Sequence, residues 1–331
     1  MKRTTIGDVA AAAGVSIATV SRVLNGGPVT EITAAKVRSA ADRLKYTPNA
    51  LTKSIFAGRS STLGVLIDDL RSPFYTDLMR GIDDVANANG SLVMFSNTFF
   101  HTGREVAQVQ AMDEQRVRGL IVTSGPSVDE RVQRMAEEGT PCVLVARAPQ
   151  TKGPRLHSVS LNNLAAGQIM AEHLVACGRT SVGVLSAGTS ASQVARVDGL
   201  RSGLRRHGEY LMDSAVEILD DDGGMVEVDN AIGTLLDNNA GLNAIVCMSG
   251  RHTVAAHTAL ANRSLAIPAD MAFLSMDDFA WAAALGITTV AQPAYEMGLS
   301  AARFVVENSL APNRLVFEPE LIARTSCGEA G

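Results

Sequence analysis

The sequence is poor in cysteine and in aromatic residues. Its 331 residues include four cysteines, one tryptophan and only 4% aromatic residues. No two cysteines form a C-x-x-C pair, which excludes the common zinc and dithiol motifs, so we expect reduced, buried thiols. His252 and His257 are five residues apart and would lie on different faces of a helix, so no metal site is expected.

Long apolar runs and the common motifs of enzymes are also missing. No apolar run approaches the ~20 residues of a membrane-spanning helix, and none of the signal-peptide type precedes Asp8. We therefore expect a soluble, cytoplasmic protein with no membrane partner. The sequence has no P-loop, no G-x-G-x-x-G after a predicted strand, no H-E-x-x-H and no nucleophile elbow. An enzyme is thus disfavoured, and no cofactor is expected.

Charge is distributed unevenly along the chain. Residues 1–60 carry nine Lys and Arg against three Asp and Glu, whereas residues 61–331 carry 20 against 31. The formal net charge of the whole chain is −5. Because DNA phosphates attract a basic segment and repel an acidic one, this balance predicts that only the N-terminal segment binds DNA.

The first 47 residues have the pattern of three short helices. Thr5, Ser16 and Thr30 each precede an apolar-periodic stretch, as N-cap residues do, and Gly14 ends the first stretch. Two helices joined by a short turn are typical of a helix-turn-helix, whose second helix, here residues 17–24, enters the major groove. On this pattern alone, an ordinary helical hairpin is an equally good interpretation.

From residue 62 onward, short β-branched runs alternate with amphipathic helical stretches. Strands that alternate with helices form parallel, doubly wound α/β sheets. Two sets of comparable length predict two lobes, with a ligand cleft at the carboxyl ends of the strands. The predicted strands are residues 62–67, 91–96, 119–122, 141–146, 181–186, 215–219, 243–248 and 271–275.

Longer stretches of the sequence are more specific than these patterns. The head contains TIGDVAAAAGVSIATVSRVLNG and KVRSAADRLKYTPNAL, and the body continues with GRSSTLGVLIDDLRSPFYTDLMRGIDDVA, ARVDGL, IPADMAFLSMDDF, ITTVAQPAYEMG and PELIARTS. In this order, over nearly the whole chain, they resemble the lactose-repressor (LacI/GalR) family of bacterial transcriptional regulators.

The resemblance implies an all-α headpiece followed by an α/β, two-lobed effector domain of the periplasmic-binding-protein type. The helix-turn-helix headpiece would cover residues 1–47 and a hinge helix or linker residues 48–60. The effector domain would cover 61–329, with lobe 1 at about 61–158 and 292–318 and lobe 2 at about 161–290 and 319–329.

The resemblance also assigns DNA contacts to the second helix and the hinge. Ile17 and Ala18 take the positions that choose the operator, and Arg22 is able to pair with guanine. Several polar residues suit phosphate contacts, although a capping role alone would also explain Thr5 and Ser16. Ile55 stands where the family has a leucine that wedges into the minor groove. The full set is Thr5, Ser16, Ile17, Ala18, Thr19, Ser21, Arg22, Asn25, Asn49, Ala50 and Ile55.

For the effector, the resemblance implies a pocket between the lobes. Arg196 and Asp277 match the family pattern directly, and such a pair can bind vicinal hydroxyls of a sugar by charge-assisted hydrogen bonds. Trp281 would stack on a sugar ring or belong to the core, and both interpretations stay open. The expected effector-binding residues are Asp69, Ser72, Phe74, Tyr75, Asn97, Arg147, Arg196, Asp277, Trp281 and Gln292.

The sequence departs from the family pattern at two acidic positions. Ser249-Gly250 stands where the family usually has Asn-Asp, and Ala146 where it often has Asp. Arginines are retained at 147 and 196, and Arg251 is close by. This loss of carboxylates beside retained arginines favours an anionic ligand, such as a sugar acid or sugar phosphate.

Together these features predict a sequence-specific DNA-binding transcriptional regulator. The resemblance implies a repressor that reads a palindromic operator as a homodimer and is controlled by a small carbohydrate-derived effector. Whether the effector releases or strengthens DNA binding stays open. Two other classes remain as alternatives, a two-lobed solute receptor of a transport system and, less favoured, a sugar-metabolising enzyme.

Overall fold

The computed structural model describes most of the chain, which divides between residues 61 and 62 into two compact units. Four predicted DNA-binding residues, Asn25, Asn49, Ala50 and Ile55, lie outside the described residues, as does nearly all of the predicted hinge. The structure describes residues 4–24, 26–46, 60–123, 125–149, 153–188, 190–220 and 223–329.

The described part of the N-terminal unit contains α1 (Ile6–Ala13), α2 (Ile17–Leu24) and α3 (Glu31–Arg43) around a small aliphatic core. Thr5 and Asp8 form a reciprocal capping box at the start of α1, and Gly14 ends that helix with a left-handed φ of 67°. The Ser16 Oγ accepts a hydrogen bond from the Thr19 N–H at 3.1 Å. The predicted caps at Thr5, Ser16 and Thr30 are therefore confirmed.

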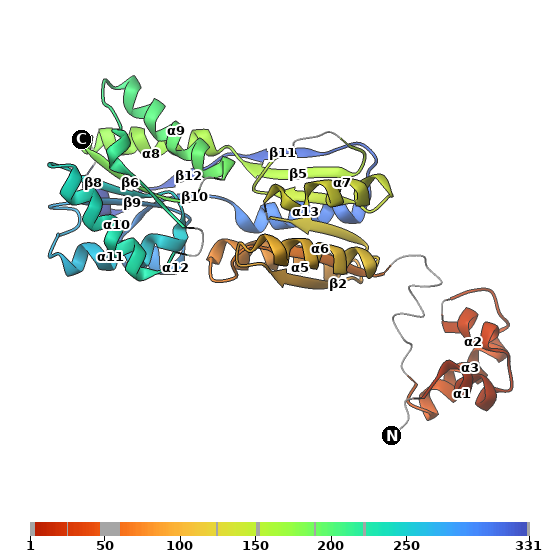
Figure 1. Ribbon diagram of the computed structural model, residues 1–331. Coiled ribbons are helices and arrows are strands. Elements are labelled where there is room, and N and C mark those ends of the chain that lie inside the picture. The colour runs from red at the N-terminus through yellow and green to blue at the C-terminus, as the bar shows by residue number, and fades with distance from the viewer. Residues whose placement is uncertain are drawn as a thin grey trace. The chain divides into compact units, whose positions relative to one another are not determined.

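The body contains two six-stranded sheets, and each defines a lobe (Figure 1). The sheet of the first lobe has the order β11-β5-β4-β3-β1-β2 and is parallel throughout. Its strands are β1 (Thr62–Ile67), β2 (Leu92–Asn97), β3 (Gly119–Val122), β4 (Cys142–Val145), β5 (Leu156–Leu161) and β11 (Arg314–Phe317).

The sheet of the second lobe has the order β12-β10-β9-β8-β6-β7, and only β12 is antiparallel to its neighbour. Its strands are β6 (Val182–Ala187), β7 (Val216–Leu219), β8 (Ala244–Cys247), β9 (Ala272–Met276), β10 (Thr288–Ala291) and β12 (Glu320–Ile322). All eight predicted strands are present. The pattern did not reveal β5, β10, β11 and β12. Of these, β11 and β12 are short edge strands, and His157 and two serines interrupt the apolar run of β5.

Helices cover both sheets and connect their strands. The first lobe carries α5 (Pro73–Ala88), α6 (Thr102–Glu114), α7 (Asp129–Glu137) and α13 (Ala294–Glu307). The second lobe carries α8 (Asn163–Ala176), α9 (Ala191–Arg206), α10 (Met225–Asn238), α11 (Thr253–Asn262) and α12 (Ala280–Ala284), with the short 3-10 turn η3 (Gly250–His252) before α11.

The chain passes from one lobe to the other at three places within the described residues. These are the connections from β5 to α8, from β10 to α13 and from β11 to β12. In Figure 1 the blue C-terminal elements α13 and β11 lie among the elements of the first lobe for this reason. Each lobe is therefore built from segments that are distant in the sequence.

Glycines let paired helices approach closely in both lobes. In the first lobe, a Cβ atom at Gly298 of α13 would lie 2.1 Å from the Leu78 carbonyl oxygen of α5. In the second lobe, a Cβ atom at Gly167 of α8 would lie 2.0 Å from the carbonyl oxygen of Arg196 on α9. The close contact of α8 and α9 fixes the backbone that carries Arg196.

No single helix in the described part of the chain is long and apolar enough to cross a membrane. The pair α1 and α2 meets the criteria of length and composition only when the two are taken together, and they are bent by 103° at the break between them.

The helix crossing in the first lobe yields a stability prediction. We expect Gly298→Ala to lower the free energy of unfolding by about 3 kcal/mol, because the new methyl group overlaps backbone atoms of α5. Gly103→Ala is the matched control, since a Cβ at Gly103 of α6 meets nothing within 4 Å. That variant should be neutral or stabilising by up to about 1 kcal/mol. Urea unfolding followed by circular dichroism measures both, and equal effects would contradict the proposed crowding at Gly298.

Candidate functional site

Helix α2 has one buried and one exposed face. Val20 and Val23 lie in the core of the N-terminal unit, whereas Ile17, Ala18 and Arg22 are exposed, Ile17 by 54%. An apolar isoleucine that is exposed on a small helical unit is free to contact another molecule. The three residues predicted to touch base edges are therefore accessible on one helix.

Polar side chains lie at the N-termini of α1 and α2. The Thr5 side chain belongs to the capping box, and the Ser16 and Thr19 hydroxyls are hydrogen-bonded to each other at 2.9 Å. Ser21 is half-buried on α2. Helix N-termini with such hydroxyls are suited to phosphate contacts, so the capping role and the predicted phosphate role are compatible.

In the second lobe, Arg196 lies in the N-terminal half of α9 and is buried, with 6% of its surface exposed. Its Nε donates to the Asn163 Oδ1 at 2.8 Å, and its Nη1 donates to the Met248 carbonyl oxygen at 2.7 Å. Asn163 begins α8, two residues after the end of β5, which was not predicted as a strand. Asn163 was therefore not predicted, although a polar residue just after a strand would have indicated it.

Asp277 follows β9 and has a left-handed φ of 68°. Its Oδ1 accepts from the Gln292 Nε2 at 2.6 Å, and its Oδ2 accepts from the Gly250 N–H at 3.2 Å. Burial raises the pKa of Asp277, although Arg196 and these two donors favour the carboxylate. Arg196, Asp277 and Gln292 are thus brought together, as predicted residues of one site.

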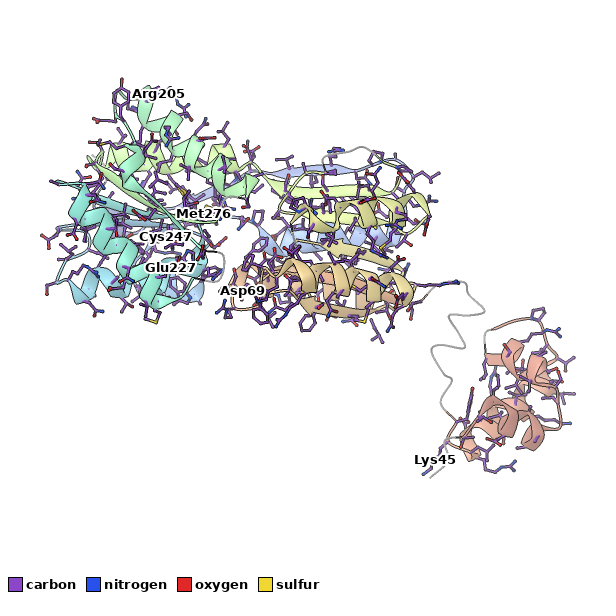
Figure 2. The ribbon with its side chains drawn as sticks, in the orientation of Figure 1. Lys45, Asp69, Arg205, Glu227, Cys247 and Met276 are labelled. Atoms are coloured by element: carbon purple, nitrogen blue, oxygen red, sulfur yellow. The ribbon has the colours of Figure 1, made fainter. Side chains whose placement is uncertain are left out.

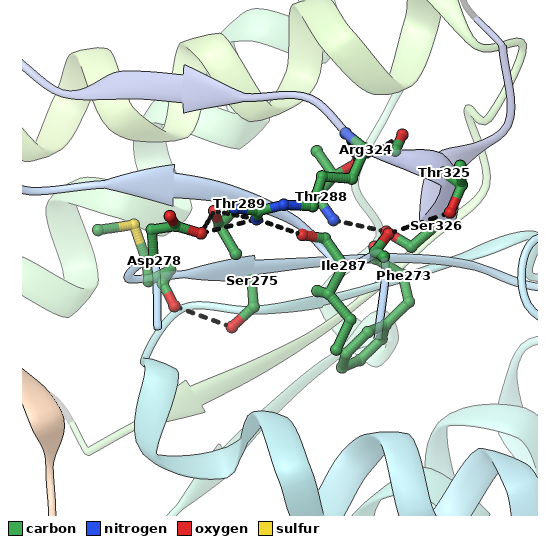
Figure 3. A network of polar contacts seen from close by, with 11 residues as sticks. Phe273, Ser275, Asp278, Ile287, Thr288, Thr289, Arg324, Thr325 and Ser326 are labelled. Atoms are coloured by element: carbon green, nitrogen blue, oxygen red, sulfur yellow. Dashed lines mark hydrogen bonds and ion pairs between the residues drawn. The ribbon is translucent and has the colours of Figure 1, made fainter. Parts of the chain in front are cut away.

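The adjacent Asp278 belongs to a different network, which ties the C-terminal segment to the second lobe (Figure 3). Its carboxylate accepts from the Thr289 hydroxyl at 2.8 Å and forms an ion pair with Arg324 at 2.6 Å. Arg324 also donates to the Ile287 carbonyl oxygen at 2.7 Å. Because Asp278 is held in this way, Asp277 is the acid of the pair that is available to the site.

In the first lobe, Asp68 and Asp69 follow β1. The Asp69 carboxylate is bound by Arg71, with its Nε and Nη2 each at 2.9 Å from one oxygen, and forms an ion pair with Arg251 of the second lobe at 3.4 Å. Figure 2 labels Asp69 at the end of the first lobe that is nearest to the second lobe. Asp69 therefore lies where the two lobes meet, and its carboxylate is already paired.

Asp68 was not predicted as a site residue, but it binds the hydroxyl of Tyr75, which was predicted as one. The Tyr75 hydroxyl donates to the Asp68 Oδ2 at 3.2 Å, and Thr98 and Thr123 donate to the same carboxylate. Burial, and after it the charge of Glu105, raise the pKa of Asp68 to about 6. Phe74 is buried against Tyr75 with 5.2 Å between ring centroids, and Ser72 is buried just before α5.

Two predicted residues carry buried atoms without a hydrogen-bond partner among the described residues. These are the Asn97 Oδ1 at the end of β2 and the Arg147 Nε after β4. Arg147 otherwise forms an ion pair with Asp129 at 2.5 Å and donates to the Gly125 carbonyl oxygen. Unpaired buried polar atoms are costly, so their presence at strand ends is typical of a ligand site.

Trp281 on α12 is half-buried and packs against the apolar core of the second lobe. Its ring lies 5.3 Å from that of Phe279 with an interplanar angle of 48°. These contacts support the interpretation that Trp281 belongs to the core, but only for part of the indole, because the side chain is not fully covered. The hydrogen bonds of Arg196 and Asp277 among the described residues go to Asn163, Met248, Gln292 and Gly250, and Trp281 is not one of these partners.

The arginines near the cleft are compensated by acids. Arg147 pairs with Asp129, and Arg251 pairs with Asp69. Arg196 and Asp277 interact as opposite charges. The sequence suggested an excess of positive charge because the partner of Arg147 is 18 residues away and that of Arg251 is on the other lobe. The premise for an anionic ligand is thereby weakened.

His252 in η3 is the most isolated polar group of this region. The residue is 2% exposed, and neither ring nitrogen has a hydrogen-bond partner in the described part of the chain. Burial, with the positive charge of Arg251, lowers the pKa of His252 to about 4. The imidazole is therefore neutral at physiological pH.

Comparison with known families agrees with both units. The model described as "Periplasmic binding proteins and sugar binding domain of LacI family" matches residues 60–314, and the one described as "Bacterial regulatory proteins, lacI family" matches residues 5–49. The chain belongs to the LacI family. This confirms the fold class and the resemblance seen in the sequence, and it makes the chain a DNA-binding transcriptional regulator and not an enzyme.

LacI-family relatives extend over almost the entire chain. The regulator DegA of Bacillus subtilis (strain 168) is 29% identical, over 98% of this chain and 98% of its own length. A crystal structure of the Lac repressor dimer with operator and the anti-inducer ONPF has a TM-score of 0.84 and 22% identity, over 99% of this chain and 100% of that one. A regulator CelR–cellobiose complex has a TM-score of 0.70 and 25% identity, over 98% and 100%.

The isolation of His252 predicts a specific pH dependence. In the folded protein its pKa is about 4, below the value of about 6.5 in an unfolded chain. The unfolded state therefore takes up the proton first, and stability is lost as pH falls from 6.5 towards 4. We expect the wild type to lose about 2 kcal/mol more than His252→Leu between pH 7 and pH 5.

Urea unfolding at the two pH values measures this difference. His101→Asn, which changes an exposed histidine, is the matched control and should retain the wild-type dependence. The same pH dependence in the wild type and in His252→Leu would show that His252 is protonated without difficulty in the folded state.

Proposed function

We propose that this LacI-family regulator is a cytoplasmic repressor. It binds a palindromic operator as a homodimer and responds to an uncharged, carbohydrate-derived effector. The proposal includes the division into a headpiece over 1–47, a hinge over 48–60 and an effector domain over 61–329. The observation that carries it is the set of buried polar groups at the carboxyl ends of strands in both lobes, above all the Arg196–Asp277–Gln292 network.

The chemistry of this network suits a polyol. Arg196 has further N–H groups beyond the two bonds described, and Asp277 has lone pairs beyond its two donors. A guanidinium and a carboxylate together can donate to and accept from neighbouring hydroxyls. Arg147 is paired with Asp129, and the charge of Arg196 is opposed by that of Asp277, so neither arginine requires an anionic ligand to balance its charge. These points support a neutral sugar over a sugar acid or phosphate.

The DNA side of the proposal follows from α2. Ile17 and Ala18 are apolar and contact thymine methyl groups, while Arg22 forms a bidentate contact to guanine. Two headpieces related by a two-fold axis read two half-sites. Effector and operator favour different arrangements of the same dimer, and so each changes the affinity of the other.

The effector half is tested first by thermal shift with neutral mono- and disaccharides, their acids and their phosphates. A ligand present at 100 times its Kd adds about 2.7 kcal/mol to the stability of the folded protein, which raises the Tm visibly. We expect the hits among neutral sugars. For the best hit, Arg196→Lys should weaken calorimetric affinity at least about tenfold, because lysine lacks the planar fork of donors.

Arg205→Lys is the matched control, since Arg205 is an exposed residue of the same helix α9. Its affinity for the hit should equal that of the wild type. Hits confined to anionic sugars, or an Arg196→Lys variant with unchanged affinity, would contradict the proposed neutral ligand and the role of Arg196.

The DNA half is tested with duplexes that the protein selects from a random pool. Arg22→Gln should lower affinity for the selected duplex by about 1–3 kcal/mol and relax the preference at one guanine per half-site. Lys36→Gln on α3 removes the same charge outside α2 and should leave the sequence preference unchanged. Equal loss for specific and unrelated duplexes in Arg22→Gln would mean that Arg22 contacts phosphate only.

A further inference from the structure

Arg251 makes several contacts at the boundary between the two lobes. Its Nε lies 3.4 Å from the Asp69 Oδ2, its Nη2 donates to the Gly223 carbonyl oxygen at 3.2 Å, and its guanidinium carbon lies 5.3 Å from the centre of the Phe100 ring. Only 9% of the Arg251 side chain and 1% of the Asp69 side chain are exposed. The guanidinium is therefore held on several sides and largely out of water.

The contacts of Arg251 with Asp69 and Phe100 cross from one lobe to the other, whereas its contact with Gly223 stays within the second lobe. Arg251 and Gly223 belong to the second lobe, in η3 and before α10, whereas Asp69 and Phe100 belong to the first lobe, after β1 and before α6. Asp69 is oriented for Arg251 by Arg71, which binds both of its oxygens from the same lobe. One long side chain of the second lobe thus reaches an acid and an aromatic ring of the first.

The turn that carries Arg251 leaves no room for the acidic residue that the family usually has before it. A Cβ atom at Gly250 would lie 2.5 Å from the Phe279 ring and 2.7 Å from the Asp277 Oδ2. The Gly250 N–H is already bonded to that same carboxylate, and the Ser249 Oγ accepts from the Arg251 N–H at 3.4 Å. Gly250 and Ser249 therefore serve to set the backbone from which Arg251 projects.

The pairing also changes the role expected for Asp69. Burial alone would raise the pKa of Asp69, yet the hydrogen bonds and charge of Arg71, together with Arg251, hold it below its usual value. An ionised carboxylate that is fully covered and bound by two arginines has little capacity left for a ligand hydroxyl.

We propose that Arg251 is a positioning residue that holds the two lobes closed in the absence of effector, by binding Asp69 across the cleft. Asp69 is then a structural partner of Arg251 and not an effector contact. Separating the lobes would expose both groups to water and would leave the Phe100 ring without its contact with the guanidinium. If the lobes are already largely closed without effector, less free energy is needed to close them when the effector binds. The apparent affinity for the effector is then higher.

The role of this contact depends on the proposed effector cleft, but its test needs neither effector nor DNA, so failure of one proposal is distinguishable from failure of the other. Spin labels are placed on full-length protein at the exposed positions Val106 of the first lobe and Met212 of the second, as V106C and M212C, with C177A to remove the half-buried native thiol. Dilution with unlabelled protein restricts the measured distances to one chain.

We expect a narrow distance distribution in the labelled parent protein. Arg251→Gln and Asp69→Asn should each broaden the distribution and shift it to longer distances, and the double variant should resemble either single one. In urea unfolding, the double-mutant cycle should show coupling of about tenfold in the unfolding equilibrium constant. Arg251→Lys keeps the charge and should restore part of the short-distance population.

Arg131→Gln is the matched control, because Arg131 forms a partly buried ion pair at 3.1 Å with Asp113 inside the first lobe. It should lower stability without changing the distance between the labels. Unchanged distances in folded Arg251→Gln, or additive effects of Arg251→Gln and Asp69→Asn on unfolding, would overturn the proposal. If Arg251→Gln does not fold, the distance distributions of Asp69→Asn and Arg251→Lys decide.

Discussion

The structure of the effector domain depends on keeping charged groups ionised after they have been removed from water. Parallel strands end at one edge of each sheet, and here those ends carry acids that are almost completely covered. A buried carboxylate is tolerated only with a cation or several donors beside it. Asp69 has Arg71 and Arg251, whereas Asp277 has Gln292, the Gly250 N–H and the charge of Arg196. Each acid therefore dictates which segment must pack next to it.

This requirement explains why the packing of helices is so tight around the site. Gly167 and Gly199 bring α8 and α9 into backbone contact, and that contact places the Arg196 guanidinium between Asn163 and the end of β8. A looser crossing would move the guanidinium by more than a hydrogen bond tolerates. The small residues of the core and the charged residues of the site are thus parts of one arrangement.

Much of the architecture was predictable because it is encoded locally. Caps at Thr5, Ser16 and Thr30 and the alternation of apolar runs with helical stretches depend on residues a few positions apart. The partners of the site residues are not encoded in this way. Asp129 and Arg147 are 18 residues apart and are brought together by the tertiary structure, and Arg251 pairs with Asp69 of the other lobe. No spacing in the sequence therefore indicates either pair. The strand β5 escaped prediction because His157 and two serines interrupt its apolar pattern.

The three connections between the lobes restrict how the effector domain can move. A single connection would allow the lobes to twist, swing and slide, but three connections resist sliding and separation. What remains is a bend in which all three segments rotate their backbone dihedrals together, as in the hinge closure of other two-lobed proteins. We therefore expect the two lobes to move mainly along one bending coordinate, and a small molecule in the cleft to act on that coordinate.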